Sequence, residues 1–284
     1  MDEALDGRGS GRERMRTADF VLIAVFVVIT IIFVMPLVVM VLSSFKPLAE
    51  IQRMPPTFWP EAPTLDSYRR VLNEAPYFLW YRNSLIVAIA VTAFAVFTSA
   101  VGGYIFAKFE FPLKQPLFVI VLATLMIPFP VLLIPNYIIA NRLGVLNSLL
   151  ALILPGTVSA FGIFLIRQFA AGIPRDLIEA ARLDGAGEWA IFGRIVLPLL
   201  RPALAALGVF TFLASWNDYL WPLVAINDLD KSTLPLALTF FNSVQSTRYD
   251  LIMAAASMAV VPVLIVFLIF QRQIVKALVL AGMR

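Results

Sequence analysis

The chain has 284 residues, of which 61% are hydrophobic and only 14% carry a charge. Soluble globular proteins carry a charge on about a quarter of their residues, so this composition indicates a membrane protein. The absence of Cys and His excludes disulfides, thiolate nucleophiles and Cys/His metal sites. The net charge of +4 is spread between apolar blocks and forms no patch for nucleic acid.

Residues 1–18 are polar and of mixed charge, which predicts a flexible tail. Four arginines precede the apolar run Phe20–Leu42, an arrangement also found in signal peptides. The run has 23 uncharged residues, more than the roughly 7–15 of a signal-peptide core, and no A-x-A cleavage site follows it. It is therefore predicted to be a retained transmembrane helix.

Six segments are long and apolar enough to span a bilayer, which takes roughly 20 residues. They are Phe20–Leu42, Ser84–Ala107, Leu117–Ala140, Ser148–Ile166, Pro202–Ile226 and Leu251–Gln271. Backbone polar groups in lipid must be hydrogen-bonded within the protein, so each segment is predicted to be a helix. The predicted fold class is an all-α integral membrane protein with six transmembrane helices.

The distribution of Lys and Arg indicates the orientation. With the N-terminus in the cytoplasm, 14 of these residues fall in cytoplasmic segments and 8 in outer segments. Five of the outer eight lie in one long connection, Phe45–Asn83. Because positive charges favour the cytoplasmic side, both termini are predicted to be cytoplasmic. The segment Ile173–Pro202, between the fourth and fifth helices, then lies on the cytoplasmic face.

The connection Phe45–Asn83 begins with several prolines and continues with a more helical stretch. We expect an outer loop with a short surface helix. Near its end, Tyr77, Trp80 and Tyr81 are typical of the membrane–water interface. Contact with an external partner is the alternative interpretation of these aromatic residues.

The second helix carries four small residues at a spacing of four, Ala95, Ser99, Gly103 and Ala107. Such a stripe lets a neighbouring helix approach closely, so we expect this helix to be packed in a bundle.

The third helix contains Pro128, Pro130 and Pro135, which are followed by Asn136 and Tyr137. Each proline removes a backbone donor and favours a kink. Kinked helices often border a cavity, which makes Asn136 and Tyr137 candidates for a translocation path. A bent helix that only packs in the bundle fits the pattern equally well.

The fifth helix contains Trp216, Asn217 and Asp218. A carboxylate at membrane depth is costly and is a functional candidate by default. The three residues are therefore candidates to face a polar path. Asp218 could also lie near the outer headgroups or be hydrogen-bonded within the bundle.

The charged segment Ile173–Pro202 is predicted to form two short helices about a glycine. The first ends at Asp184-Gly185, where Gly185 can adopt a left-handed conformation. The second covers roughly 188–196 and stops before Pro198. Small residues and Glu179 on the first helix suit docking on a basic partner. The alternative is a cluster of Arg175, Glu179 and Arg182 within the helix, which would contribute only a few tenths of a kcal/mol per pair.

A longer pattern runs through this segment: Glu179-Ala180-Ala181, three residues, Gly185, nine residues, then Ile195-x-Leu197-Pro198. It resembles the EAA signature of ABC importer permeases at all seven fixed positions. Further stretches resemble maltose-type carbohydrate permeases, namely Asn83-Ser84, IPNYIIANRLGVLNSLLALILP, WNDYLWPL and QRQIVKAL. Gly187 and Ala277 depart from that family, which commonly has Ser and Gly there.

The resemblance implies a permease subunit of a binding-protein-dependent ABC importer for a di- or oligosaccharide, in a bacterial or archaeal cytoplasmic membrane. Residues 19–276 would be the permease domain, with the coupling loop at 169–201 and a cytoplasmic tail at 277–284. The implied coupling residues are Glu179, Ala180, Ala181, Asp184, Gly185, Ile195, Leu197 and Pro198.

The resemblance also implies the partners. They are a second permease subunit in a heterodimer, two cytoplasmic ABC ATPase subunits, an extracytoplasmic sugar-binding protein and the lipid bilayer. The chain has no Gly-x4-Gly-Lys-Ser/Thr phosphate loop, since Lys231-Ser232 has no glycine upstream. It is therefore expected to be non-catalytic and to bind no cofactor, while ATP and Mg are used by the ATPase subunits.

Two other interpretations stay open on the residues. Within the same architecture, the substrate could be a polyol or glycerol phosphate. A self-contained secondary transporter or channel would carry several intramembrane charges or an inverted repeat, whereas only Asp218 is seen and no repeat is evident. A membrane-embedded enzyme would need a group of catalytic residues, and the sequence gives no support for one.

Overall fold

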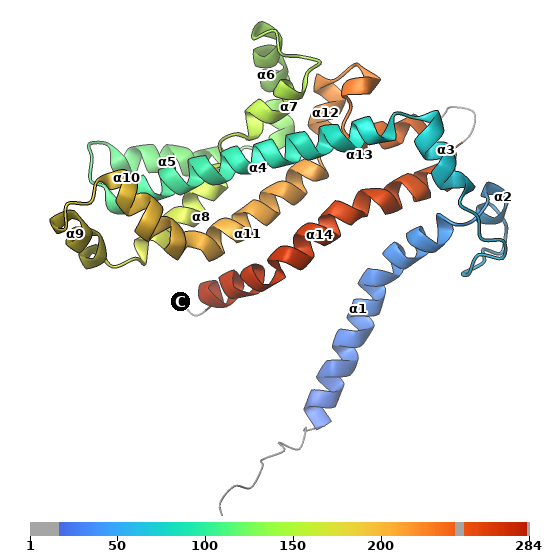
Figure 1. Ribbon diagram of the computed structural model, residues 1–284, viewed down its shortest axis with the longest axis horizontal. Coiled ribbons are helices and arrows are strands. Elements are labelled where there is room, and N and C mark those ends of the chain that lie inside the picture. The colour runs from blue at the N-terminus through green and yellow to red at the C-terminus, as the bar shows by residue number, and fades with distance from the viewer. Residues whose placement is uncertain (1–16, 242–246, 283–284) are drawn as a thin grey trace, which may run out of the picture.

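The computed structural model describes residues 17–241 and 247–282, which form helices joined by loops (Figure 1). The first half contains α1 (Thr17–Ser43), α2 (Leu48–Ile51), α3 (Asp66–Glu74), α4 (Tyr77–Lys108), α5 (Lys114–Thr124), α6 (Phe129–Arg142), α7 (Leu149–Ile153) and the 3-10 turn η1 (Leu154–Gly156). The second half contains α8 (Ala160–Ala171), α9 (Arg175–Leu183), α10 (Glu188–Ile191), the π-helical turn η2 (Phe192–Val196), α11 (Leu197–Trp216), α12 (Leu220–Ala225), η3 (Leu229–Lys231), α13 (Leu234–Ala237), η4 (Leu238–Phe241) and α14 (Tyr249–Gly282).

Helix α4 packs against both α8 and α11, which also contact each other. The predicted small-residue stripe faces α8. A side chain at Gly103 would lie 2.7 Å from Cβ of Ile166, and one at Gly162 of α8 would lie 2.1 Å from Oγ of Ser99. Two helices can approach this closely only where one of them has no side chain. The prediction that this helix is packed in a bundle is confirmed.

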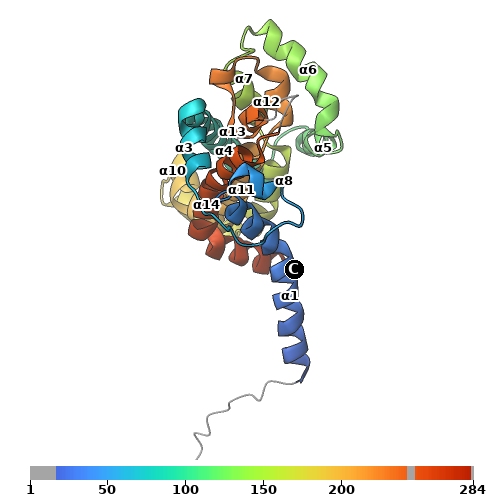
Figure 2. The ribbon, with the colours of Figure 1, turned by 90° about the vertical axis from the view of Figure 1, so that its right-hand side faces the viewer.

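Helix α1 stands apart from the bundle and contacts it only toward its C-terminal end, next to α14 (Figures 1 and 2). None of its most apolar stretch is buried within the chain. Its side chains are apolar all round, with Phe33 76% exposed. Such a helix is suited to lipid or to another membrane helix rather than to water.

The end of the bundle opposite α9 is built from the connection that carries α2 and α3. Tyr77 and Trp80 are almost completely buried there, and Tyr81 is partly buried against them. The Tyr77 hydroxyl donates to Ala255 O over 2.8 Å, and Trp80 Nε1 donates to Leu229 O over 2.8 Å. The predicted anchoring of these aromatic residues at the membrane interface is therefore wrong for Tyr77 and Trp80, because both fasten α4 to other segments of the chain.

The third predicted membrane helix is broken. Helices α5 and α6 meet at an angle of 101°. Pro128 has extended backbone angles and stands immediately before α6. Helix α5 ends at Thr124, and proline disfavours a helical conformation in the residue before it, so Ile127 does not carry the helix on into α6. The described residues thus hold five helices able to span a membrane, or six if this bent pair is one span.

The fifth predicted helix begins earlier and ends earlier than expected. Helices α10 and α11 form one continuous rod of 29 residues, Glu188–Trp216, through the π-helical turn η2. The separate second short helix over 188–196 was therefore a wrong prediction. Pro198 has no N–H for the Arg194 carbonyl, which is one reason that the turn before it departs from α-helical geometry without ending the helix.

The structure describes only part of the two predicted tails. The tail at 1–18 lies outside the described residues except for Thr17 and Ala18, which already belong to α1. Helix α14 continues to Gly282, so residues 277–282 extend the last helix. Residues 283–284 lie outside the described part.

Candidate functional site

Helix α9 projects from one end of the bundle, and its end is fixed by glycine (Figure 1). Gly185 has φ of +82°, which an L side chain rarely adopts. Gly185 N donates to Arg182 O over 3.0 Å, and Ala186 N donates to Ala181 O over 2.9 Å. These paired bonds satisfy the last carbonyls of α9 and reverse the chain toward α10. The predicted left-handed end at Gly185 is confirmed.

One face of α9 is anchored in the core. Ile178 is 3% exposed and belongs to a buried cluster with Ile173, Ile191 and Phe192. Because apolar residues on both sides of Gly185 share this cluster, α9 and the start of the rod 188–216 are held together.

The opposite face of α9 is exposed and carries most of the EAA signature. Glu179, Ala180, Asp184 and Gly185 are exposed, and Ala181 is partly exposed. Glu179 makes no ion pair with another residue in the described ranges. Two large apolar side chains stand out beside it, Leu183 at 89% and Trp189 at 74% exposure. The signature did not include either of them, and only their apolar character beside charged residues could have singled them out.

The arginines of α9 pair with residues outside the helix. Arg182 Nε donates to Glu188 across the glycine turn over 2.7 Å, and this hydrogen bond raises the pKa of Arg182. Arg175 reaches Glu110 on the α4–α5 connection over 3.3 Å. Glu110 also accepts from Lys114, and that bond lowers the pKa of its carboxyl. The cluster of Arg175, Glu179 and Arg182 considered from the sequence is thus not formed as ion pairs.

The last three residues of the signature lie in the rod 188–216 and not on α9. Ile195 lies in η2, and Leu197 and Pro198 begin α11, all three partly buried in the rod 188–216. Neighbouring Val196 and Leu200 belong to the same buried cluster as Tyr104 and Ile166. These residues therefore connect the exposed helix to the membrane-spanning core rather than forming part of the exposed surface.

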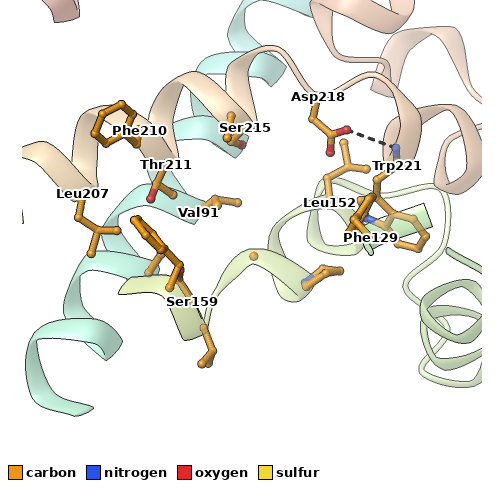
Figure 3. Close-up of a pocket in the computed structure, with 16 residues that line it drawn as sticks. Val91, Phe129, Leu152, Ser159, Leu207, Phe210, Thr211, Ser215, Asp218 and Trp221 are labelled. Atoms are coloured by element: carbon orange, nitrogen blue, oxygen red, sulfur yellow. Dashed lines mark hydrogen bonds between the residues drawn. The ribbon is translucent and has the colours of Figure 1, made fainter. Parts of the chain in front are cut away.

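At the other end of the rod is a cavity of about 560 Å³ between α4, η1, α8, α11 and α12 (Figure 3). Its walls are mainly apolar, with Phe129, Leu152, Leu207, Phe210 and Trp221 among them. Four polar side chains also line it: Ser159, Thr211, Ser215 and Asp218. The Asp218 carboxylate accepts from Trp221 N over 3.3 Å, and the lining residues include no Lys or Arg.

The structure brings only one of the five predicted path residues to this cavity. Asp218 lines it, just beyond the end of α11. Trp216 is buried against Phe212, and its Nε1 donates to Ala259 O over 3.2 Å. Asn217 Nδ2 donates to Leu213 O in the last turn of α11. Asn136 and Tyr137 lie on α6 and are not among the lining residues, although Phe129 at the start of the same helix is.

The three hydroxyl residues of the cavity were missed by the sequence analysis, since Ser and Thr are common in membrane helices. Among residues 17–241 and 247–282, no group of three or more Asp and Glu side chains could hold a metal ion.

Residues 99–279 match the family described as "Binding-protein-dependent transport system inner membrane component". This chain belongs to that family. The match covers α9, the rod 188–216 and most of α14. Family membership speaks against the self-contained secondary transporter or channel considered above, and identifies the chain as a permease component rather than a catalytic one.

Curated relatives support the same assignment. The permease is 37% identical over 262 residues to the arabinooligosaccharides transport system permease protein AraQ of Halalkalibacterium halodurans, covering 91% of this chain and 94% of that one. It is 33% identical to the lactose transport system permease protein LacG of Rhizobium radiobacter, covering 93% and 96%. The sn-glycerol-3-phosphate transport system permease protein UgpE of Yersinia pestis is 37% identical over a shorter match of 73% and 74%.

Solved structures share the fold. A bacterial ABC transporter for import of the acidic polysaccharide alginate matches with a TM-score of 0.79 at 21% identity, covering 91% of the permease and 98% of that chain. An alginate transporter in complex with an alginate-bound periplasmic protein matches with a TM-score of 0.65 at 16% identity, covering 91% and 96%.

Proposed function

We propose that this permease forms one half of the translocation path of an ABC importer for a neutral di- or oligosaccharide. It would form a heterodimer with a second permease, receive sugar from an extracytoplasmic binding protein, and take its energy from two cytoplasmic ATPase subunits that use ATP and Mg. The chain itself would hydrolyse nothing and bind no cofactor.

One observation carries this proposal: a single rod joins the exposed α9 surface to the cavity. Glu179, Leu183 and Trp189 offer a charge and apolar side chains that no described residue covers. Exposed apolar side chains beside a charge are typical of a protein interface. A movement imposed there would reach the cavity through the helix 188–216, whose far end is next to Asp218.

The orientation is part of the proposal. In the six-span topology, 14 of the 22 Arg and Lys residues fall in the segments on the same side of the membrane as α9, and this distribution supports a cytoplasmic position for that side. The ATPase subunits would then meet α9 from the cytoplasm, and the binding protein would meet the α3 end.

The cavity supports a neutral sugar over glycerol phosphate. Its four polar side chains can exchange hydrogen bonds with sugar hydroxyls, while its apolar walls suit the faces of sugar rings. An anionic substrate would meet the Asp218 carboxylate with no cationic side chain among the lining residues. The full-length similarity to AraQ and LacG supports the same choice, whereas the match to UgpE is shorter.

The Glu179→Lys variant tests the coupling role. Reversing an exposed charge at the interface should lower sugar uptake and binding-protein-stimulated ATP hydrolysis by about tenfold or more, because an unpaired like charge opposes docking. Both rates would be measured in vesicles that hold the complete transporter, after confirming equal amounts in the membrane.

Asp176→Lys is the matched control, since it makes the same reversal on the same helix outside the signature. It should cost α9 only the roughly 0.3–1 kcal/mol of a helix-dipole interaction and leave both rates near the original values. If Glu179→Lys transports and hydrolyses like the original chain, α9 is not the coupling surface.

A further inference from the structure

The connection between α2 and α3 contains an exposed apolar segment, residues 54–60, which we call the tip. It lies at the opposite end of the bundle from α9 (Figure 1). Its sequence, MPPTFWP, contains no charge. Met54 is 87% exposed, Trp59 69% and Phe58 46%. Three large apolar side chains together on a loop of a few residues are unusual on a surface that faces water.

Prolines reduce the number of backbone donors in the tip, since Pro55, Pro56 and Pro60 have no N–H. The Thr57 carbonyl accepts from the buried Lys46 ammonium group, and the Thr57 hydroxyl donates to Glu50 over 2.8 Å. The other backbone polar groups of the tip can be hydrated at the membrane interface, whereas they would be unpaired in the hydrocarbon core.

The base of the tip is closed by charged side chains. Arg53 Nη1 donates to Glu61 Oε2 over 2.8 Å, and both side chains are more than half exposed. Glu61 N donates to Glu50 Oε1 over 3.0 Å, which lowers the pKa of the Glu50 carboxyl. The loop is therefore polar at its base and apolar at its tip.

The tip also continues an apolar surface of the membrane helix α1. Phe58 borders a groove of about 300 Å³ whose other walls are Thr30, Ile31, Val34, Met35 and Val38 of α1. These residues belong to the 24-residue candidate span 20–43. The exposed face of α1 thus extends onto Phe58 without an intervening charge.

We infer that residues 54–60 anchor the permease in the lipid interface beside α1, with Met54, Phe58 and Trp59 inserted among the lipids. Trp is enriched at this depth because its ring is apolar while its N–H can meet water or headgroups. The Arg53–Glu61 pair at the base lies at headgroup level, where charged side chains remain solvated. This inference goes beyond the transport function and does not depend on it.

The test uses the absence of cysteine from the chain. A nitroxide is attached to Trp59→Cys, and separately to Met54→Cys, in the complete transporter reconstituted in phosphatidylcholine–phosphatidylglycerol vesicles. Collisions with oxygen, which concentrates in lipid, are compared with collisions with a water-soluble nickel chelate. Arg69→Cys on α3, with 75% of its side chain exposed, is the water-facing control, and Phe33→Cys on α1 is the lipid-facing one.

The oxygen-to-nickel collision ratio at positions 54 and 59 should exceed that at position 69 severalfold and approach that at position 33. Ratios equal to that at position 69 would show that the tip lies in water and would overturn the inference. Low collision rates with both reagents at positions 54 and 59 would overturn it as well, because they would show that another protein covers the tip. Labels at two positions guard against a local disturbance at either one.

Discussion

Asp218 is the residue on which the character of the cavity depends. It stands two residues beyond the end of α11, with Ser159, Thr211 and Ser215 on the surrounding walls (Figure 3). Its carboxylate accepts a hydrogen bond from Trp221 N over 3.3 Å. A carboxylate has room for several acceptor bonds, so part of its capacity is free for hydroxyl donors.

The Asp218→Asn variant should therefore weaken sugar uptake. A hydrogen bond to a charged group contributes about 1.5–3 kcal/mol, which corresponds to a loss of tenfold or more in uptake at low sugar concentration. Transport rate against sugar concentration in vesicles is the measurement.

Asn217→Ala serves as the control, because Asn217 bonds to Leu213 O and does not line the cavity. It should leave uptake near the original rate. Unchanged uptake in Asp218→Asn would assign Asp218 to packing, and a loss in both variants would point to a disturbed end of α11.

Sequence alone could pick out Asp218, because a charged residue at membrane depth is rare and its residue type is enough to identify it. It could not separate Asp218 from its neighbours Trp216 and Asn217. Which of three consecutive residues faces a cavity depends on where α11 ends, and that end is set by contacts such as Trp216 Nε1 to Ala259 O. The same limit applies to Tyr77 and Trp80, whose hydrogen-bond partners lie more than a hundred residues away.

At the level of helices, the closest contact is the one between α4 and α8. A Cβ at Gly103 would lie 2.7 Å from Cβ of Ile166 and 2.8 Å from the backbone N of Arg167. Backbone atoms cannot give way as a side chain can. Gly103 is therefore required by the distance between the two helices.

The Gly103→Ala variant should lower the free energy of unfolding by about 1–3 kcal/mol, the usual cost of overpacking. Gly208→Ala is the matched control on α11, since a Cβ there would lie 3.7 Å from Val96, an ordinary contact. Alanine should stabilise that helix by up to about 1 kcal/mol. Thermal unfolding in one detergent should give midpoint shifts of opposite sign, and equal shifts would contradict the close α4–α8 contact.

The spans themselves could be read from hydropathy, because a long apolar run has few alternatives to a membrane helix. The positions at which a predicted helix is interrupted could not be read from hydropathy. Pro36, Pro135, Pro202 and Pro262 lie inside unbroken helices, whereas Pro128 stands at the 101° bend. A missing N–H is tolerated where neighbouring helices support the backbone, so the outcome depends on packing that the local sequence does not contain.

At the scale of the whole molecule, the proposed orientation can be tested directly. Asp176→Cys on α9 and Arg69→Cys on α3 place thiols on exposed side chains at opposite ends of the bundle. With α9 in the cytoplasm, a membrane-impermeant maleimide added to intact cells should label position 69 and not position 176. Both should react after permeabilisation. Labelling of position 176 in intact cells would reverse the orientation.

The unbroken helix from Glu188 to Trp216 also sets how motion can be transmitted. Twenty-nine residues make a rod about 43 Å long. Under the proposed coupling at α9, a push at that end of the helix would act at the cavity as a tilt. A tilt of about 5° around the midpoint of such a rod would carry each tip about 2 Å sideways, which is comparable to the helix shifts that accompany switching in other proteins. The helix would then act as a lever arm, and replacing residues along its middle would change its stiffness without touching either end.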